Sequence, residues 1–596
     1  MSIYTKLPKW EFNSYFLSVF VLFIYFSYKV YDSTLNLHLD KPALIELTML
    51  KENFLGFEET ANSHWNAAID STMFLKYQLM FLILSYALHS TSLFKSVGCK
   101  KEILMVLAII TNSLFFTILV PIICILMCFL FTILTFLPKK SKYYVILFGF
   151  LYYYLFDRYV ASSFLDTQRK FLAHHDSIYV EKIIMLSYPL IFLTIIRCIM
   201  MAMERLSEKS LTPISLREYI VDNILYLMWP YNVFCGPLIM YSDWCARNRN
   251  ITPKGCITKR FLSLPSLTFR FARLVVWFYF WRITMTYLYP NLNIVYSNLN
   301  QPPDVFSKVN ETFSAIKFED HFKDKSVIAL SFSLYLIGMT FYFAYLVIYG
   351  MARWLNDTHD FITRYNMIPG EYDQLIPDGP RCISHVFLYS EMWQKFDVGL
   401  YNFVKLHIYL PFIYGDGQVR KRFYAIDTAD KETLSNRYLR LRKAIAALLT
   451  FSSILIYHSI SWKTSNIFIL HLLIFSSVIW LVVNMVQIIL EKLIIHLYMN
   501  TSVGEKARYH LSPRNIRRLS AVLMTLSGII SHLSAMFFII GFTHGKWVTV
   551  IALHNPEIII PVLMVMYMVV QISIDSRKYS GIEYSALVNS NIKQKT

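Results

Sequence analysis

Uninterrupted apolar stretches, each long enough to cross a lipid bilayer, recur along the whole of this 596-residue chain. A helix needs about 20 consecutive apolar residues to span the hydrocarbon core. Inside lipid every backbone polar group must be satisfied within the protein, so a spanning segment is either an α-helix or part of a closed barrel. The stretches are continuous rather than alternating in hydrophobicity, which excludes a barrel. The sequence therefore predicts an all-α, multi-pass membrane protein.

The apolar stretches predict about ten transmembrane helices plus re-entrant or interfacial segments. After a first stretch at residues 15–28, the others lie at residues 73–94, 103–137, 143–161, 182–203, 219–241, 267–290, 326–352, 443–462, 466–493, 518–542 and 547–573. The stretch at 103–137 is long enough for a tight pair of helices. Trp229–Ile239 contains Pro230, Gly236 and Pro237, which predicts a broken segment, because proline interrupts a helix.

Charge and cysteine content exclude two classes of protein. The formal net charge is +18, but the basic residues lie in short linkers between apolar stretches, where membrane topology accounts for them. We therefore expect membrane lipids, and no nucleic acid, among the partners. The eight cysteines include no C-x-x-C pair, so neither a disulfide framework nor a zinc site is expected.

The distribution of charge also predicts the topology. The loop at residues 32–72 is acidic, and the positive-inside rule places such a loop on the lumenal side, with the N-terminus in the cytoplasm. The chain ends in a polar segment, residues 575–596, which we expect to be a cytoplasmic tail. Residues 1–574 are then expected to form a single transmembrane domain.

One aspartate interrupts an otherwise apolar stripe. A helix over residues 391–411, ending before Pro411, would align Trp393, Phe396 and Leu400 at three- and four-residue spacing, and Asp397 falls on the same face. A buried carboxylate is costly and is usually paired or functional. The alternative is a helix lying in the membrane interface, with Asp397 in contact with solvent.

A histidine lies within a later apolar stretch. His458 lies near the end of this stretch, and no other histidine, acidic or basic residue occurs between Lys443 and Lys463. A histidine inside a membrane is a candidate functional residue by default, since a buried neutral imidazole can accept a proton. The alternative is a histidine that only forms a hydrogen bond to a neighbouring helix.

This order of features resembles the membrane-bound O-acyltransferase (MBOAT) superfamily, and within it the Hedgehog acyltransferase family. The resemblance is carried by four segments in order along the chain: LPKWEFNSYFLSVFVLFIYFSYKVY at 7–31, PYNVFCGPLIMYSDW at 230–244, PRCISHVFLYSEMWQKFDVGLYNFVKLHIYLPF at 380–412 and HLSPRNIRR at 510–518. It implies an MBOAT-type fold with its catalytic core in residues 377–493.

The resemblance also implies an activity, a location and site residues. The activity is transfer of palmitate from palmitoyl-CoA to the N-terminal cysteine amine of a secreted Hedgehog-type signalling protein. The location is the endoplasmic reticulum membrane, with the Golgi as a second site. Asp397 and His458 would be the catalytic pair, Trp393 and Lys395 would contact acyl-CoA, and Cys382 would ligate the iron of haem b.

Other activities stay open at this point. A related MBOAT enzyme could acylate a serine of a secreted protein or a glycerolipid, since an Asp and a His are common to these reactions. A catalytically inactive paralogue acting as a scaffold is a further alternative, because the sequence reads Tyr457-His458-Ser459 where relatives usually have Trp-His-Gly. A channel or transporter would instead distribute ionisable groups along several helices, whereas here two focal groups stand out.

Overall fold

The computed structural model describes most of the helical part of the chain. The residues described are 7–39, 50–53, 56–59, 63–90, 100–138, 142–175, 177–207, 215–233, 236–248, 259–288, 327–364, 371–373, 379–380, 396–414, 437–460, 514–530 and 556–576, with a few single positions that include Cys382. Within these residues the regular secondary structure is helical apart from four short strands.

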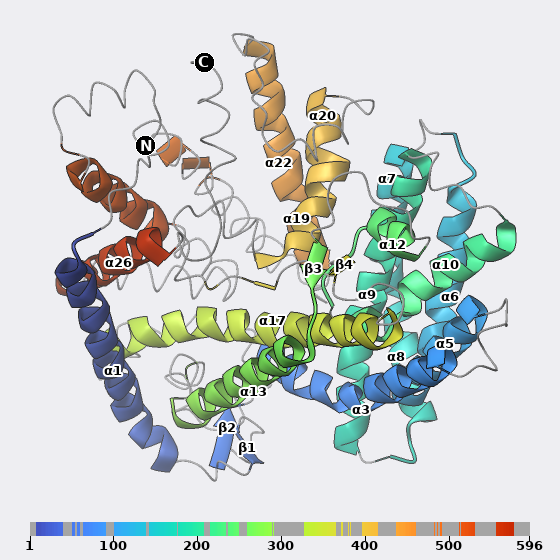
Figure 1. Ribbon diagram of the computed structural model, residues 1–596, viewed down its shortest axis with the longest axis horizontal. Coiled ribbons are helices and arrows are strands. Elements are labelled where there is room, and N and C mark those ends of the chain that lie inside the picture. The colour runs from blue at the N-terminus through green and yellow to red at the C-terminus, as the bar shows by residue number, and fades with distance from the viewer. Residues whose placement is uncertain are drawn as a thin grey trace.

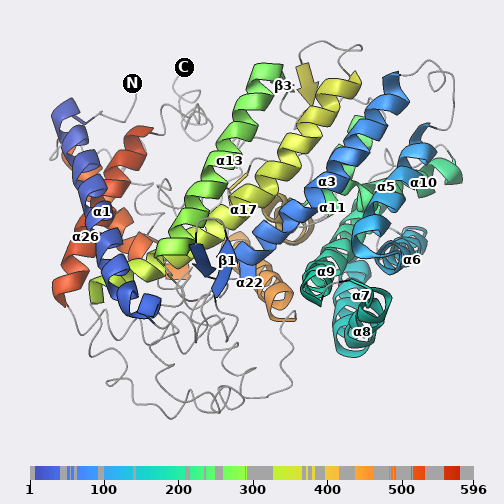
Figure 2. The same ribbon diagram turned by 90° about the horizontal axis from the view of Figure 1, so that it is seen from below.

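A long helix, α17 (Val327–Arg364), runs through the middle of the molecule (Figures 1 and 2). Helices α3 (Ser63–Ser90) and α13 (Leu264–Tyr287) pack along it, and α1 (Lys9–Leu39) crosses its N-terminal end. With 38 residues, α17 is about 57 Å long, whereas the bilayer core is about 30 Å thick. This helix therefore connects the two ends of the structure.

A bundle of helices lies at the far end of α3 from α1 (Figure 1). Its members are α5 (Lys100–Phe116), α6 (Leu119–Leu134), α7 (Lys142–Leu155), α8 (Ala161–Phe171), α9 (Ser177–Ser207) and α10 (Leu216–Met228), with the π-turn η2 (Phe156–Val160) joining α7 to α8. Helix α9 packs against α6 and α7. The largest apolar core lies between these helices.

Short elements complete the fold. Strands β1 (Leu50–Asn53) and β2 (Gly56–Glu59) form one antiparallel pair, and β3 (Lys259–Phe261) and β4 (Glu371–Asp373) form another. The second pair joins the chain just before α13 to the chain just after α17. At the other end of α17, α26 (Pro556–Ser576) packs against α1.

Three of the described helices are long and apolar enough to cross a membrane. They are Lys9–Thr34 in α1, Ala68–Ser90 in α3 and Ile328–Thr363 in α17. Large apolar side chains of α1, including Phe16, Phe20 and Ile24, are exposed on its surface, as expected for a helix that faces lipid. The chain is thus a membrane protein, and the count of about ten transmembrane helices stays a prediction.

The helix pair expected at residues 103–137 is confirmed. Helices α5 and α6 meet at Thr117, whose φ of 78° lies in the left-handed region that non-glycine residues rarely adopt. This residue reverses the chain between the two helices. Within the expected stretch at 466–493, the structure describes only isolated helical positions.

Three expected boundaries were wrong. The loop predicted at residues 32–72 is shorter, because α1 continues to Leu39 and α3 already begins at Ser63. Tertiary contacts support these polar turns: Thr34 is fully buried, and Asp70 pairs with Lys182 of α9 at 3.2 Å.

Helix α17 likewise runs on past the predicted end at residue 352 to Arg364, where Asp357 of this extension pairs with Arg270 at 3.0 Å. Helix α26 also extends to Ser576, past the boundary expected at residue 575. In each case a polar segment remains helical because ion pairs or burial stabilise it, which hydropathy does not reveal.

The break predicted within Trp229–Ile239 is confirmed. Helix α10 ends at Met228, Trp229 adopts an extended conformation, and α11 (Pro230–Val233) forms one short turn. Residues 236–240 are non-helical, and α12 (Tyr241–Asn248) follows. This entire broken segment, to which we refer as residues 229–240, is buried wherever it is described.

Side chains from four helices bind the broken segment and the residue before it, three of them at backbone carbonyls and Asn356 at two side chains. Asn112 of α5 donates to the carbonyl of Met228 at 2.8 Å, and Gln78 of α3 donates to that of Pro230 at 2.9 Å. Arg197 of α9 donates to the carbonyl of Asn232. Asn356 of α17 donates to the Asn232 side chain at 2.9 Å and accepts from the Trp229 indole at 3.0 Å. These bonds replace the helical ones that the break removes.

We predict that Gln78→Leu and Asn112→Leu each destabilise the fold. Each change leaves a buried backbone carbonyl without its donor, which costs about 1–3 kcal/mol of unfolding free energy. Thermal unfolding in detergent measures the loss. Ser113→Ala is the control, because the Ser113 hydroxyl bonds to Ile109 within its own helix α5. Equal melting temperatures for all three variants would contradict the prediction.

Candidate active site

Asp397 stands at the beginning of a helix rather than in the middle of one. Helix α19 covers Val398–Val404, and the Asp397 carboxylate caps it by accepting the Leu400 N–H at 3.0 Å. The expectation of one helix over 391–411 was therefore wrong at Asp397, since an N-cap aspartate satisfies free N–H groups of the first turn. Residues 391–395, which include Trp393 and Lys395, lie outside the described residues.

Asp397 is also held by the central helix. The Tyr349 hydroxyl of α17 donates to Asp397 Oδ2 at 2.8 Å. Next to it, the Phe396 ring stacks on Phe341 of α17, with centroids 5.2 Å apart. Burial raises the pKa of the Asp397 carboxyl, while its hydrogen bonds from Leu400 and Tyr349 act in the opposite direction. The carboxylate is thus fixed between two helices rather than exposed at an interface.

The helix that Asp397 caps continues beyond Pro411. Helix α19 leads into a π-turn, η7 (Lys405–Tyr409), and then α20 (Leu410–Tyr414). The Leu410 N–H bonds to the Lys405 carbonyl, five residues back, as is characteristic of a π-turn. The wider turn accommodates Pro411, which has no N–H and would otherwise clash with the preceding turn. The predicted end before Pro411 was wrong for this reason.

The start of α19 lies directly against the broken segment. A methyl group on Gly399 would clash with the Leu238 carbonyl oxygen and would lie 2.9 Å from both the carbonyl carbon and the amide nitrogen of Leu238. Such close backbone approach requires glycine. The stretch around Asp397 and the proline- and glycine-containing stretch at residues 229–239, which the sequence analysis both identified, are therefore in contact. Asp397 lies two residues before the contact at Gly399.

Helix α22 (Arg437–Ile460) contains His458 in its last turn. The side chain of His458 lies outside the part of the structure that is described. The helix itself packs against η7 and α20, and Arg442 donates to the Phe412 carbonyl through Nε at 3.1 Å. The two segments that carry the predicted catalytic residues are thus packed together.

An apolar pocket lies between these two segments. It is lined by Ile146, Phe150, Ile196, Ile199, Leu400, Phe403, Val404, Ile408, Ser453 and Ile454. Leu400 is one turn after Asp397. Ile454 is one turn before His458, and residues four apart lie on the same face of a helix. The pocket therefore extends from one turn beyond Asp397 to one turn short of position 458.

Cys382 is partly exposed and forms no disulfide with any residue that the structure describes. Tyr342 of α17 lies in electrostatic range of both Cys382 and Arg273. A thiolate is one of the axial ligands used for haem iron, and a guanidinium can bind a carboxylate. Cys382 is thus of a residue type that ligates haem iron, and the presence of a haem in this protein stays a prediction.

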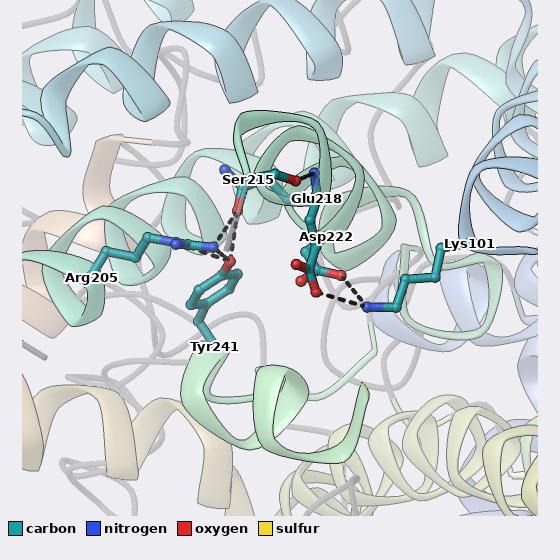
Figure 3. A network of polar contacts seen from close by, with 7 residues as sticks. Lys101, Arg205, Ser215, Glu218, Asp222 and Tyr241 are labelled. Carbon is teal, nitrogen blue, oxygen red and sulfur yellow. Dashed lines mark hydrogen bonds and ion pairs between the residues drawn. The ribbon is translucent and has the colours of Figure 1, made fainter. Parts of the chain in front are cut away.

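Buried polar residues form a network at the end of α9 that the sequence did not reveal. Figure 3 shows Arg205 directed at Tyr241, whose hydroxyl accepts from Arg205 Nε at 3.0 Å, and Lys101 directed at Asp222, with Nζ and Oδ1 3.3 Å apart. Tyr241 in turn donates to Asn223 at 2.7 Å. These contacts join α5, α9, α10 and the start of α12, just beyond the broken segment.

We predict that Gly399→Ala displaces the start of α19. Its methyl group would meet backbone, which cannot rotate away, so the helix would move from residues 236–240. Amide hydrogen exchange at residues 398–404 should accelerate, and the melting temperature should fall. Gly338→Ala is the matched control, because nothing lies within 4 Å of a methyl group there. Unchanged exchange in Gly399→Ala would contradict the close approach.

Two curated proteins are similar to the chain over part of its length. Protein-cysteine N-palmitoyltransferase Rasp of Drosophila melanogaster is 26% identical over 216 residues, which cover 36% of this chain and 33% of that protein. Protein-cysteine N-palmitoyltransferase HHAT of Mus musculus is 25% identical over 230 residues, which cover 38% of this chain and 36% of that protein. No family model matches the chain.

The aligned part thus amounts to about a third of the length of each relative. Both relatives are named for the same reaction, the N-palmitoylation of a protein cysteine. The similarity supports, at low identity, the resemblance to Hedgehog acyltransferases that the sequence motifs indicate.

Proposed function

We propose that this protein transfers palmitate from palmitoyl-CoA to the N-terminal cysteine amine of a secreted Hedgehog-type signalling protein. The observation that supports this most is the apolar pocket between Leu400 and Ile454, one turn from Asp397 and one turn from His458. Acyl transfer from a lipid-like donor requires apolar surroundings for the acyl chain close to the reacting groups.

The location of the pocket in a membrane protein suits an acyl donor. Each buried CH₂ group is worth about 0.8 kcal/mol, so a long acyl chain resists leaving an apolar phase. At the pocket it would remain in apolar surroundings while its thioester reaches the polar groups at the ends of α19 and α22. Trp393 and Lys395 precede Asp397 in sequence, and we assign them to acyl-CoA binding.

The chemistry needs no serine or cysteine nucleophile. The substrate amine attacks the thioester carbonyl, a C–N bond forms, the C–S bond breaks, and the amine proton passes to the leaving CoA sulfur. We assign binding of the amine to Asp397 and proton transfer to His458. A positioned base contributes about 10²–10⁴-fold in rate, and orientation of the two reactants contributes further.

The same proposal includes a location, a topology and a cofactor. We place the protein in the endoplasmic reticulum membrane as a multi-pass protein, with acyl-CoA arriving from the cytosol and the secreted partner from the lumen. Haem b would be held by Cys382, where the iron would supply a redox-active centre. The acyl transfer proposed above does not depend on it.

The test is an acyl-transfer assay on the full chain in nanodiscs. Palmitoyl-CoA is offered with a peptide bearing a free N-terminal cysteine, with its acetylated form and with a serine-centred peptide. Amide-linked palmitate on the free-amine peptide alone supports the proposal. Transfer to serine or to a glycerolipid would show that the acceptor is not the N-terminal amine proposed here. Acyl-CoA binding without transfer to any acceptor would favour an inactive scaffold.

Asp397→Asn separates the catalytic role of this residue from its capping role. Asparagine caps a helix about as well as aspartate, so the fold should be retained while the charge is lost. We expect kcat/KM for the free-amine peptide to fall by about 10–10²-fold, because a hydrogen bond to a charged group is worth about 1.5–3 kcal/mol. Asp397→Ala should lose the same activity and about 0.5–2 kcal/mol of stability as well. Full activity in Asp397→Asn would show that Asp397 serves only as the N-cap of α19 and has no role in the reaction.

His458→Ala tests the other member of the pair. Removal of the proton acceptor should lower kcat by about 10²–10⁴-fold while acyl-CoA binding persists. Single-turnover kinetics with a matched binding assay measures both. A variant that binds and transfers normally would remove His458 from the mechanism.

Tyr349→Phe should change the pH dependence of transfer. The Tyr349 hydroxyl donates to the Asp397 carboxylate and stabilises its ionised form, which lowers the carboxyl pKa. Without this donor the pKa rises further, so the ionised form is lost at a higher pH during acidification. The acid limb of kcat/KM should therefore move to higher pH. An unmoved acid limb would show that Asp397 ionisation does not limit the reaction.

A further inference from the structure

Glu204, near the end of α9, is a fully buried carboxylate that contacts two other segments. Its Oε2 atom accepts the backbone N–H of Ser242 in α12 at 2.7 Å. Its Oε1 atom lies 3.5 Å from Nε2 of His407, which is itself buried in the π-turn η7. A carboxylate in such surroundings is costly unless it is paired and hydrogen-bonded; the Ser242 N–H supplies a hydrogen bond, and His407 lies within ion-pair distance.

These contacts join the same two segments that already meet at Gly399. Gly399 of α19 lies against Leu238, and eight residues later His407 faces Glu204, which holds Ser242, four residues after Leu238. The α19–η7 segment and the residues after the break are therefore held together at two points. Asp397 precedes the first of these points by two residues.

Neighbouring groups keep Glu204 and Ser242 in place. Tyr241, the residue before Ser242, accepts from Arg205 and donates to Asn223 (Figure 3). The Arg205 guanidinium also lies over the Tyr219 ring at 3.8 Å. On the other side, the His407 ring packs on Phe403, which lines the apolar pocket. A change at the Glu204–His407 pair would thus act on the pocket wall and on α19 together.

We propose that Glu204 and His407 are positioning residues for acyl transfer, which set the placement of α19 and so of the Asp397 carboxylate. The inference rests on the proposed function for the reaction that it serves. Neither residue contacts the reacting atoms in this proposal. Their effect passes through the α19–η7 segment, and it should appear in the rate of the chemical step rather than in binding of the acyl donor.

The test uses variants of the full chain in nanodiscs: one variant at each residue removes its polar group, and a conservative variant at Glu204 retains it. Glu204→Met and His407→Leu should each lower kcat, with little change in KM for palmitoyl-CoA. A displacement of a catalytic group by about 1 Å can cost about 10²-fold in rate. Glu204→Gln should retain most activity, because the glutamine amide has the same shape as the carboxylate and can still accept the Ser242 N–H while facing His407. The double variant should be no worse than the worse single variant, since either change removes the same contact.

Asp575→Asn is the matched control. Asp575 pairs with buried Arg517 at 2.7 Å, at the opposite end of α17 from Glu204. Its loss should lower the melting temperature without changing kcat per folded molecule. If Glu204→Met and His407→Leu lose activity only in proportion to lost folded protein, or if their effects multiply, the positioning role is overturned.

A second measurement separates this inference from the proposed function. Hydrogen exchange at residues 398–409 is followed in the wild-type chain, Glu204→Met and Asp575→Asn, whether or not any acyl acceptor is modified. Faster exchange in Glu204→Met alone supports the placement of α19 by Glu204 even where the wild-type chain transfers no palmitate. Equal exchange in all three overturns it, whatever the reaction proves to be.

Discussion

The structure depends on how the chain satisfies a helix that is broken inside the membrane domain. At Trp229 and Pro230 the backbone leaves the α-helical path, and its carbonyls lose their intrahelical donors. In the hydrocarbon core of a bilayer no water is present to hydrogen-bond such groups. The chain supplies amide and guanidinium side chains from α3, α5 and α9 to these carbonyls instead, and Asn356 of α17 binds the side chains of Trp229 and Asn232. Because each donor comes from a different helix, the break also fixes the relative positions of all four.

The candidate site is built on this fixed break. The first turn of α19 can approach residues 236–240 only because position 399 is glycine, and that approach carries Asp397 to the Tyr349 hydroxyl of α17. Helix α22 then packs on the following turns, with an apolar pocket between them. The carboxylate, the pocket and the helix with His458 are therefore consequences of one packing arrangement. Each would move if the break moved.

Hydropathy and proline placement predicted a helical membrane protein, the α5–α6 pair and the broken segment, because these depend on local composition. They did not predict where helices with polar ends terminate. Helices α1 and α17 extend into polar sequence because contacts between distant residues, such as Asp357–Arg270, stabilise these turns. The sequence singled out Asp397 but left its burial open, and it did not predict its place as an N-cap, because apolar periodicity alone does not mark a helix start. Glu204, His407 and Tyr349 gave no signal in sequence, since each depends on a partner in another segment.

The π-turn between α19 and α20 has a consequence for how related chains compare. A π-turn holds one residue more than the α-helical turn it replaces, and each residue of an α-helix rotates the chain by about 100°. Loss of one residue from Lys405–Tyr409 would restore a regular helix and turn its two halves relative to each other by roughly that angle. The face that carries Gly399 and the face that meets α22 would no longer be aligned. A one-residue gap at this point between two chains of similar sequence would therefore mark a different architecture around the carboxylate, even where every other motif matched.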